Sequence, residues 1–317
     1  MSQPRRHHYC PQFYLSGFTE DSRPDGRLWA IDKTTKLARP SKPNLEAHQR
    51  DFYRIDVQEG ADPFYLEREF SKIEDGTRHA IAHVVSTGTM PDIEGYGFLM
   101  SFIGLQAVRT PWHREWHGEF MRDIAKKMIQ ISCASKERFE QMYERLRESD
   151  SDIPEGVSYD DMRAFVDGER YRIEIDQTFQ IDAMLKMAST ITDLLIPRNW
   201  TIVFSNCDTN FVTSDNPVGL AWHSDVPGPY SPGFGLKNTE VTFPLNKRVA
   251  LVGMFEPMPA IAQMSEAAVA SLNNHAIRRA TRHIYSATED FAWYSSENRV
   301  EGRSALFQAE ETDRSEP

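Results

Sequence analysis

The chain has 317 residues, of which 40% are apolar and 26% are charged, so it can bury a core and is too apolar for a disordered protein. Its net charge of −11 argues against tight, non-specific binding to duplex nucleic acid, because phosphate contacts require a basic surface. Three scattered cysteines and the absence of an apolar run of roughly 20 residues predict a cytoplasmic protein without a disulfide framework or a membrane span.

The N-terminal part of the chain predicts short strands followed by a helix. The stretch "RLWAIDKTTKLARP" (27–40) predicts a β-hairpin with a polar turn, and "RDFYRID" (50–56) predicts another extended segment. A helix is then predicted from the N-cap Asp62, with Pro63 in its first turn, to a stop at Gly88, because apolar residues recur at helical spacing.

The middle of the chain predicts helices. Residues 97–133 have the apolar content of a helix that Pro111 breaks. A charged amphipathic helix follows at 135–152, and a further helix within 158–200 ends before Pro197.

The last third of the chain returns to the alternating pattern of strands. Strands are predicted within 200–220 and 239–255, and a final helix is predicted across 264–287. This order of elements predicts one α+β domain over residues 1–300, with N-terminal strands, a central block of helices, C-terminal antiparallel strands and a closing helix. The polar segment 301–317 is predicted to be a disordered tail.

Two carboxylates share one edge of the helix predicted over 64–87. Glu67 and Glu74 are seven residues apart and lie beside the apolar stripe that contains Leu66 and Phe70. They either form a solvated edge of the helix or face a cleft.

An arginine lies on the apolar face of the next predicted helix. Arg109 falls on the same face as Phe98 and Leu105, with Gln106 beside it. A guanidinium does not lose its charge, so a buried Arg109 requires an anionic partner. The partner is either a carboxylate in a structural ion pair or an anionic ligand, and both can hold. The candidate carboxylates are Glu67, Glu74 and Asp215.

Polar residues follow an apolar strand in "FVTSDNPVG" (211–219). Asp215 and Asn216 precede a proline, which favours an Asx turn. The end of a strand is also a place where a rigid scaffold presents polar groups, but this stretch alone favours the turn.

The N-terminal segment "RRHHYCPQFYL" (5–15) has the composition of a protein interior. On an extended segment His7 and His8 point to opposite sides, so one of them is expected to face a site. Gln12 adds another polar group, and burial of this segment would require several hydrogen-bond partners.

An Arg-x4-His spacing occurs at Arg278 and His283, as in a family of metal-free ribonucleases. Chance accounts for this spacing in a chain with so many arginines and ten histidines.

The motifs together resemble those of the domain of unknown function 4238 (DUF4238) family over nearly the whole chain. The matching stretches occur in one order: "HHYCPQFYLSGF" (7–18), "LEREFSKIE" (66–74), "LQAVRTP" (105–111), "WTIVF…FVTSDNPV" (200–218), "FPL" (243–245) and "SLNNHAIRRATRHIYSA" (271–287). Cys10 departs from the family, which more often has valine there. The resemblance implies a prokaryotic, intracellular, single-domain α+β protein and supplies no activity.

The resemblance also implies that a set of scattered polar residues meets in space, since these residues occupy the motif positions of the family. They are His7, His8, Gln12, Glu67, Glu74, Arg109, Asp215 and Asn216.

One functional hypothesis is a metal-dependent phosphodiester hydrolase, similar to a nuclease, in a defence or toxin role. His8 and Asp215, with Glu74 as a third candidate, would hold zinc or manganese, and Arg109 would orient a phosphate. The catalytic candidates are His8, Glu67, Glu74, Arg109 and Asp215. The ligand-binding candidates are His7, Gln12, Gln106 and Asn216.

The alternative is a non-catalytic sensor or binding module for an anionic, nucleotide-like ligand, built around a buried arginine network. Either hypothesis makes a small anionic ligand or a single-stranded nucleic acid the expected partner. The two differ in the effect of removing His8, which would abolish metal binding only in the hydrolase.

Overall fold

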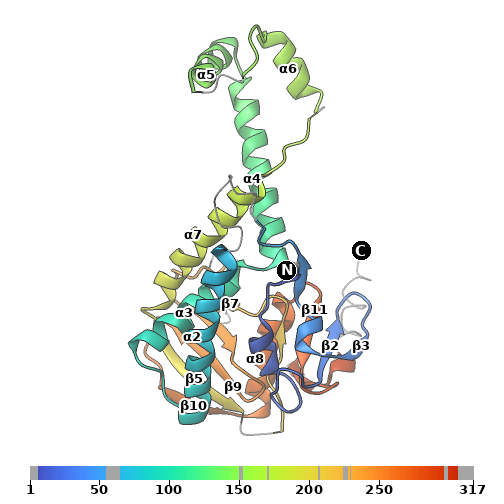
Figure 1. Cartoon of the computed structure of the whole chain (residues 1–317), viewed down its shortest axis with the longest axis vertical. Helices are drawn as coiled ribbons and strands as arrows, with labels where there is room; N and C mark the ends of the chain where they lie inside the picture. The colour runs from blue at the N-terminus through green and yellow to red at the C-terminus, as the bar shows by residue number, and fades with distance from the viewer. Residues whose placement is uncertain are drawn as a thin grey trace. The chain divides into compact units, whose positions relative to one another are not determined.

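The computed structural model describes residues 6–54, 65–149, 153–169, 171–205, 208–223, 228, 230–295 and 299–305. The chain has the predicted α+β order of N-terminal strands, central helices and C-terminal strands (Figure 1). It divides into two compact units, one of residues 1–113 and 183–317 and the other of residues 114–182. The prediction of one domain over 1–300 stays a prediction.

The helices account for most of the central part of the chain. Their bounds are α1 (Gln12–Ser16), α2 (Tyr65–Thr87), α3 (Ile93–Val108), α4 (Pro111–Ser132), α5 (Lys136–Ser149), α6 (Tyr159–Asp167), α7 (Gln177–Leu195) and α8 (Glu266–Arg279), with a 3-10 turn η1 (Pro43–Leu45). None of the described helices is long and apolar enough to cross a membrane.

Two larger sheets organise the first unit. One has the strand order β10-β5-β9-β8-β7, in which only β10 and β5 are parallel, and its strands are β5 (Asn199–Ser205), β7 (Gly219–Trp222), β8 (Thr239–Pro244), β9 (Val249–Met254) and β10 (Ile261–Met264). The other is antiparallel with the order β3-β2-β11-β6, and its strands are β2 (Leu28–Asp32), β3 (Ala38–Ser41), β6 (Thr213–Ser214) and β11 (His283–Ser286).

Two small antiparallel pairs complete the strands. They are β1 (Arg6–His8) with β4 (His48–Arg50), and β12 (Trp293–Tyr294) with β13 (Val300–Glu301). The predicted tail therefore begins inside β13, and residues 306–317 lie outside the described residues.

The second unit packs around a small apolar cluster. Cys133, Phe139 and Val166 are buried there, and Ile129 and Tyr143 pack against them. The cluster joins the end of α4 to α5 and α6.

Several sequence predictions about local structure are confirmed. The hairpin of 27–40 is β2 with β3, and the strand pair of 239–255 is β8 with β9. Pro111 is the first residue of α4, where its missing N–H costs nothing, and Gly88 ends α2 with a φ of +68° that favours glycine. The predicted cap at Asp62 and Pro63 lies outside the described residues.

Two predictions of element boundaries are wrong. The extended segment predicted at 50–56 gives way to a turn after Arg50, and its residues 55 and 56 lie outside the described residues. The helix predicted within 158–200 to end before Pro197 is confirmed as α7, which ends at Leu195, and the separate helix α6 precedes it. The helix predicted across 264–287 ends at Arg279, and the next residues form β11. β11 pairs with both β2 and β6, and this ladder outweighs local helical propensity.

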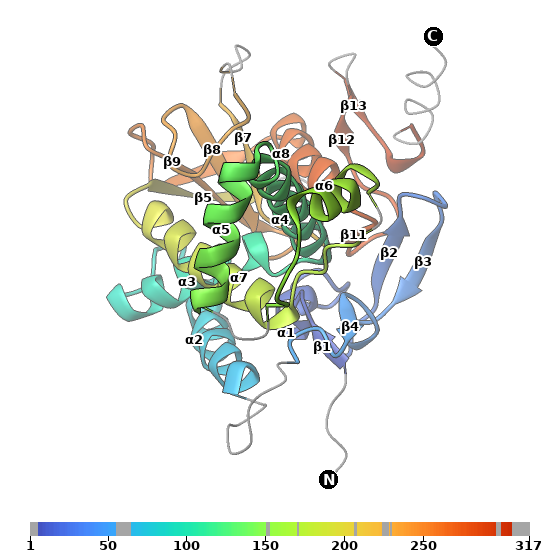
Figure 2. The same ribbon diagram turned by 90° about the horizontal axis from the view of Figure 1, so that it is seen from above.

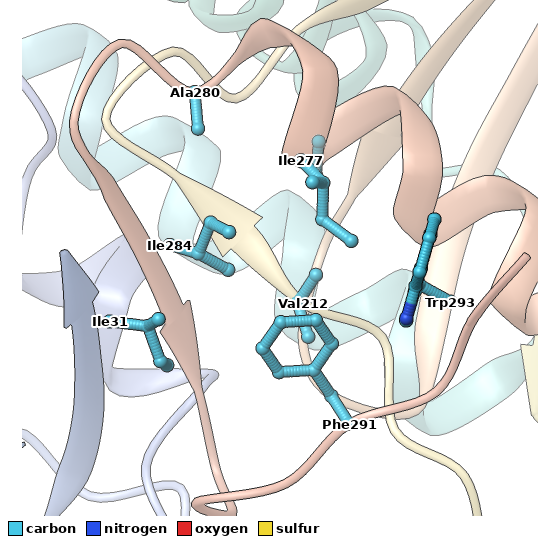
Figure 3. Close-up of a cluster of buried hydrophobic side chains, with 8 residues drawn as sticks. Ile31, Val212, Ile277, Ala280, Ile284, Phe291 and Trp293 are labelled. Carbon is cyan, nitrogen blue, oxygen red and sulfur yellow. The ribbon is translucent and has the colours of Figure 1, made fainter. Parts of the chain in front are cut away.

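α8 lies beside β7 (Figure 2) and buries one side in an apolar cluster. Figure 3 shows Ile277 of α8 with Ile284 of β11, Ile31 of β2 and Val212. Trp293 and Phe291 close the cluster from the C-terminal side. This packing holds the helix backbone of α8, which carries polar residues outside the cluster.

Candidate functional site

His7 ties the N-terminal strand to α2. Its Nδ1 accepts a hydrogen bond from the backbone N–H of Tyr53 at 2.8 Å, so its Nε2 carries the hydrogen that points to Glu67 Oε1 at 2.7 Å. The ring also stacks on Tyr53, with the centroids 5.8 Å apart. His7 and Glu67, two of the predicted site residues, are therefore direct partners.

His8 points to the other side of β1, as the alternation of a strand requires. Its Nδ1 donates to the carbonyl oxygen of Glu46 at 3.0 Å, and its Nε2 accepts from the Gln12 amide at 2.9 Å. Burial and the nearby His48 lower the pKa of His8 to about 4, so the ring is neutral at pH 7. Both ring nitrogens are engaged with the protein.

Arg109 is buried, with 2% of its surface exposed, and forms the centre of a hydrogen-bond network. Its Nη1 donates to Glu74 Oε1 at 3.0 Å and its Nη2 to the carbonyl oxygen of His8 at 2.7 Å. Its Nε donates to the Tyr53 hydroxyl at 3.1 Å, and the guanidinium lies over the rings of Tyr53 and Phe70. Glu74 is thus the carboxylate, among the three predicted candidates, that pairs with Arg109.

The helix geometry around Arg109 differs in one respect from the prediction. Arg109 is the C-cap residue of α3, not part of the helical face. Burial disfavours its charge, but Tyr53 and Glu74 offset this cost and raise the pKa of Arg109 above its ordinary value. The guanidinium therefore joins β1, α2 and the end of α3 as a permanent charge.

Asp215 binds the backbone of the segment that connects α8 to β11. Its Oδ1 accepts from the backbone N–H of Thr281 at 2.8 Å, and its Oδ2 accepts from those of Arg282 and His283 at 2.8 and 2.9 Å. Burial raises the pKa of Asp215, and the three N–H donors act in the opposite direction. The sequence favours an Asx turn, in which Asp215 would bind its own local backbone, but the carboxylate binds the backbone of a distant segment.

Cys10 connects the N-terminal segment to the remaining predicted residues. Its buried thiol lies 3.7 Å from Gln106 Oε1 and 3.6 Å from the carbonyl oxygen of Ser214. Ser214 in turn exchanges hydrogen bonds with the backbone of Asn216. Gln106 Nε2 and Asn216 Oδ1 are buried without a hydrogen-bond partner among the described residues.

Three of the predicted site residues affect the pKa of the Cys10 thiol. Burial raises the pKa of Cys10 above its ordinary value, and Asp215 and Glu74 act in the same direction, while Arg109 opposes them. Contacts therefore join His7 to Glu67, and Arg109 to Glu74 and the backbone of His8. Cys10 connects this group to the backbone of Ser214, next to Asp215. The convergence of the whole set on one pocket stays a prediction.

The metal site predicted at His8 and Asp215 stays a prediction. The nitrogen and oxygen atoms that would bind a metal already form the hydrogen bonds given above. In the part of the chain that the structure describes, no three His, Cys, Asp or Glu side chains gather in a metal-binding arrangement.

A second polar cluster lies in a pocket of about 430 Å³ between α8 and β7. The apolar wall of this pocket, which we call the α8 pocket, is formed by Leu220, Ala221, Trp222 and Pro232. The polar wall is formed by residues of α8, namely Ser271, Asn274, His275, Arg278 and Arg279. The volume lies in the range of small-molecule sites.

The two arginines of the α8 pocket differ from Arg109 in lacking a carboxylate partner. No carboxylate of the described residues forms an ion pair with Arg278 or Arg279, and the Nε atom of Arg279 is buried without a hydrogen-bond partner among them. The Arg279 guanidinium lies 5.0 Å from the ring centroid of Trp112. Burial lowers the pKa of Arg279.

His275 forms the inner end of the polar wall. Its Nε2 lies 3.4 Å from Glu240 Oε1, and its Nδ1 lies 3.3 Å from Thr242 Oγ1. The backbone approaches closely at Gly219, where a Cβ atom would lie 2.9 Å from His275 Cβ and 2.1 Å from Thr242 Oγ1. Only glycine lets β7 lie this close to His275 and β8.

The sequence contained no periodic signal for several of these contacts. Tyr53 falls in the segment predicted as a strand, and Glu240 is one acidic residue among 47. The Arg-x4-His spacing did include Arg278, but His283 lies in β11, with its Nε2 3.7 Å from Asp32 Oδ2. Two adjacent arginines in the last turn of α8, Arg278 and Arg279, are the signal that could have pointed to this surface.

The chain matches a known protein family. The family model described as "Protein of unknown function (DUF4238)" matches residues 6–290. No curated protein and no solved structure matches the chain.

Proposed function

We propose that this chain, which belongs to the DUF4238 family and takes no activity from that family's description, is a binding module for an anionic, nucleotide-like ligand. The ligand would occupy the α8 pocket, and the protein would act as a sensor or carrier of that ligand. The proposal keeps the anion-binding hypothesis and moves it from Arg109, which Glu74 already neutralises, to Arg278 and Arg279.

The observation that carries the proposal is the Nε atom of Arg279, which is buried without a hydrogen-bond partner among the described residues. Beside it lies Arg278, an exposed arginine that has no ion pair among the same residues. A desolvated guanidinium is costly unless an anion compensates its charge. The C-terminal dipole of α8 favours arginine in the last turn, but it does not supply a hydrogen-bond acceptor to Nε. A phosphate can accept hydrogen bonds from both guanidinium groups.

The other wall of the pocket favours a ligand with an aromatic part. Trp222, Leu220 and Pro232 form an apolar surface opposite the arginines. A nucleobase stacks on an aromatic side chain, and its phosphate would then reach the charged wall. The division of the pocket into an apolar and a cationic wall is therefore the reason for choosing a nucleotide over inorganic phosphate.

The metal-dependent phosphodiester hydrolase is the competing hypothesis. It requires His8 and Asp215 to release their present hydrogen-bond partners before they can bind zinc or manganese. Metal content measured by mass spectrometry distinguishes the two. About one metal per chain in the wild type and none in His8→Ala would support the hydrolase.

The direct test is calorimetric titration of the purified full chain with adenosine 5′-monophosphate. We expect binding to the wild type and at least a tenfold weaker affinity in Arg279→Gln, since a charge-assisted hydrogen bond contributes about 1.5–3 kcal/mol. Arg282→Gln is the matched control, because Arg282 is exposed and pairs with Asp32 outside the pocket. Equal affinity in Arg279→Gln and the wild type, or no binding of mono-, di- or triphosphates of any base, would refute the proposal.

A further inference from the structure

His275 is the one titratable side chain on the polar wall of the α8 pocket that is neither a permanent charge nor exposed. Its side chain is 18% exposed, and both of its ring nitrogens have partners on β8. Glu240, the partner of Nε2, uses its second oxygen to bind His223 Nδ1 at 2.9 Å. The histidine is thus fixed in orientation beside the arginines.

The partners of His275 are compatible with both of its charge states. Glu240 Oε1 lies 3.4 Å from Nε2 and faces the ring in both charge states, as an ion-pair partner once the ring is charged. The Thr242 hydroxyl donates to Nδ1 of the neutral ring and, after rotation, accepts from Nδ1–H of the charged ring. Protonation at Nδ1 therefore breaks no hydrogen bond.

The charged groups around His275 set the balance between these states. Glu240 on β8 favours the charged ring, and Arg278, one helical turn along α8, opposes it. His223 lies on the far side of Glu240, and the residues of β7 between Gly219 and Trp222 carry no charge. Burial acts with Arg278, so the pKa of His275 is lowered in the free protein.

We propose that His275 makes the α8 pocket selective for a phosphate monoester dianion, because the ring takes up a proton when such a dianion binds beside Arg278. The inference rests on the proposed anion site. The proton comes from the solvent and binds Nδ1, and no other bond is formed or broken. A dianion cancels the repulsion between Arg278 and the charged His275 ring, and it also attracts that ring. A diester monoanion has the same two effects to a smaller extent.

The selectivity follows from linkage between the two binding events. A ligand that raises the pKa of His275 binds more tightly as the pH falls through the interval between the free and the bound pKa values. Each unit by which the ligand raises the pKa of His275 corresponds to at most about a tenfold gain in affinity across that interval. A monoester should therefore gain affinity on acidification before its own phosphate, with a pKa of about 6, is protonated.

The experiment compares adenosine 5′-monophosphate with its methyl phosphodiester by calorimetry. Titrations between pH 6 and 8 in buffers of different ionisation enthalpy give the protons taken up. We expect about a tenfold preference for the monoester in the wild type, with net proton uptake. In His275→Gln, we expect the preference to fall to about threefold or less and the uptake to vanish, with a larger loss of affinity for the monoester than for the diester.

A control variant and a measurement on the wild type distinguish failure of this inference from failure of the proposed function. His223→Gln removes the other partner of Glu240 outside the pocket and should retain the preference. The proton uptake of the wild type tests the inference even if His275→Gln does not fold. Equal binding of both ligands, with the loss still seen in Arg279→Gln, would overturn this inference and leave the binding module intact. Binding of neither ligand would overturn both.

Discussion

Replacing Arg109 by alanine tests whether the N-terminal network stabilises the fold. The substitution removes the guanidinium from between the rings of Tyr53 and Phe70 and leaves Glu74 without its cation. The carbonyl oxygen of His8 also loses its hydrogen-bond donor. The change is thus a break in an ion pair that connects three segments distant in sequence.

The expected loss can be worked out from the burial of the two partners. Removing one member of a buried ion pair costs about 3–5 kcal/mol. The side chain of Glu74 is 24% exposed, so its carboxylate regains some water, and the lower part of that range applies. We expect Arg109→Ala to lower the free energy of unfolding by about 3–4 kcal/mol in urea, followed by tryptophan fluorescence.

Two further variants show whether the charge is the cause. Arg23→Ala removes an exposed arginine that lies 3.8 Å from Asp25, and it should change the free energy of unfolding by less than about 0.5 kcal/mol. Adding Glu74→Gln to Arg109→Ala removes the uncompensated carboxylate and should restore about 1–2 kcal/mol. A loss below about 1 kcal/mol in Arg109→Ala, or no restoration in the double variant, would refute the ion-pair explanation.

Three other substitutions follow from the geometry. Asp215→Ala leaves the N–H groups of 281–283 without their acceptor and should cost about 2–4 kcal/mol in the same assay, and an unchanged stability would contradict this role. Between pH 6.5 and about 4 the unfolded chain binds a proton at His8 that the folded chain excludes, so stability should fall on acidification. After allowance for partial exposure, this loss is about 1–2 kcal/mol. His8→Gln should flatten the curve of stability against pH, whereas parallel curves for variant and wild type would disprove the assignment. Gly219→Ala places a Cβ atom 2.1 Å from Thr242 Oγ1 and should cost about 1–3 kcal/mol and weaken nucleotide binding, and a wild-type melting curve would count against the close approach.

The sequence determined the local elements where the signal was periodic or chemical. The 3.6-residue pattern of α2, the alternating strands β8 and β9, and the break at Pro111 all depend on neighbours within a few residues. It also indicated that Arg109 must meet an anion, because a buried guanidinium cannot shed its charge.

The tertiary structure alone decided how the polar residues are used. The choice of Glu74 over Glu67 as the partner of Arg109 depends on where α2 and α3 pack, which no local pattern contains. The segment after Arg279 becomes β11 because β2 and β6 offer it hydrogen bonds on both sides. Long-range pairing and burial fix these outcomes. The contrast between the neutralised Arg109 and Arg279, which has no ion pair among the described residues, arises from them.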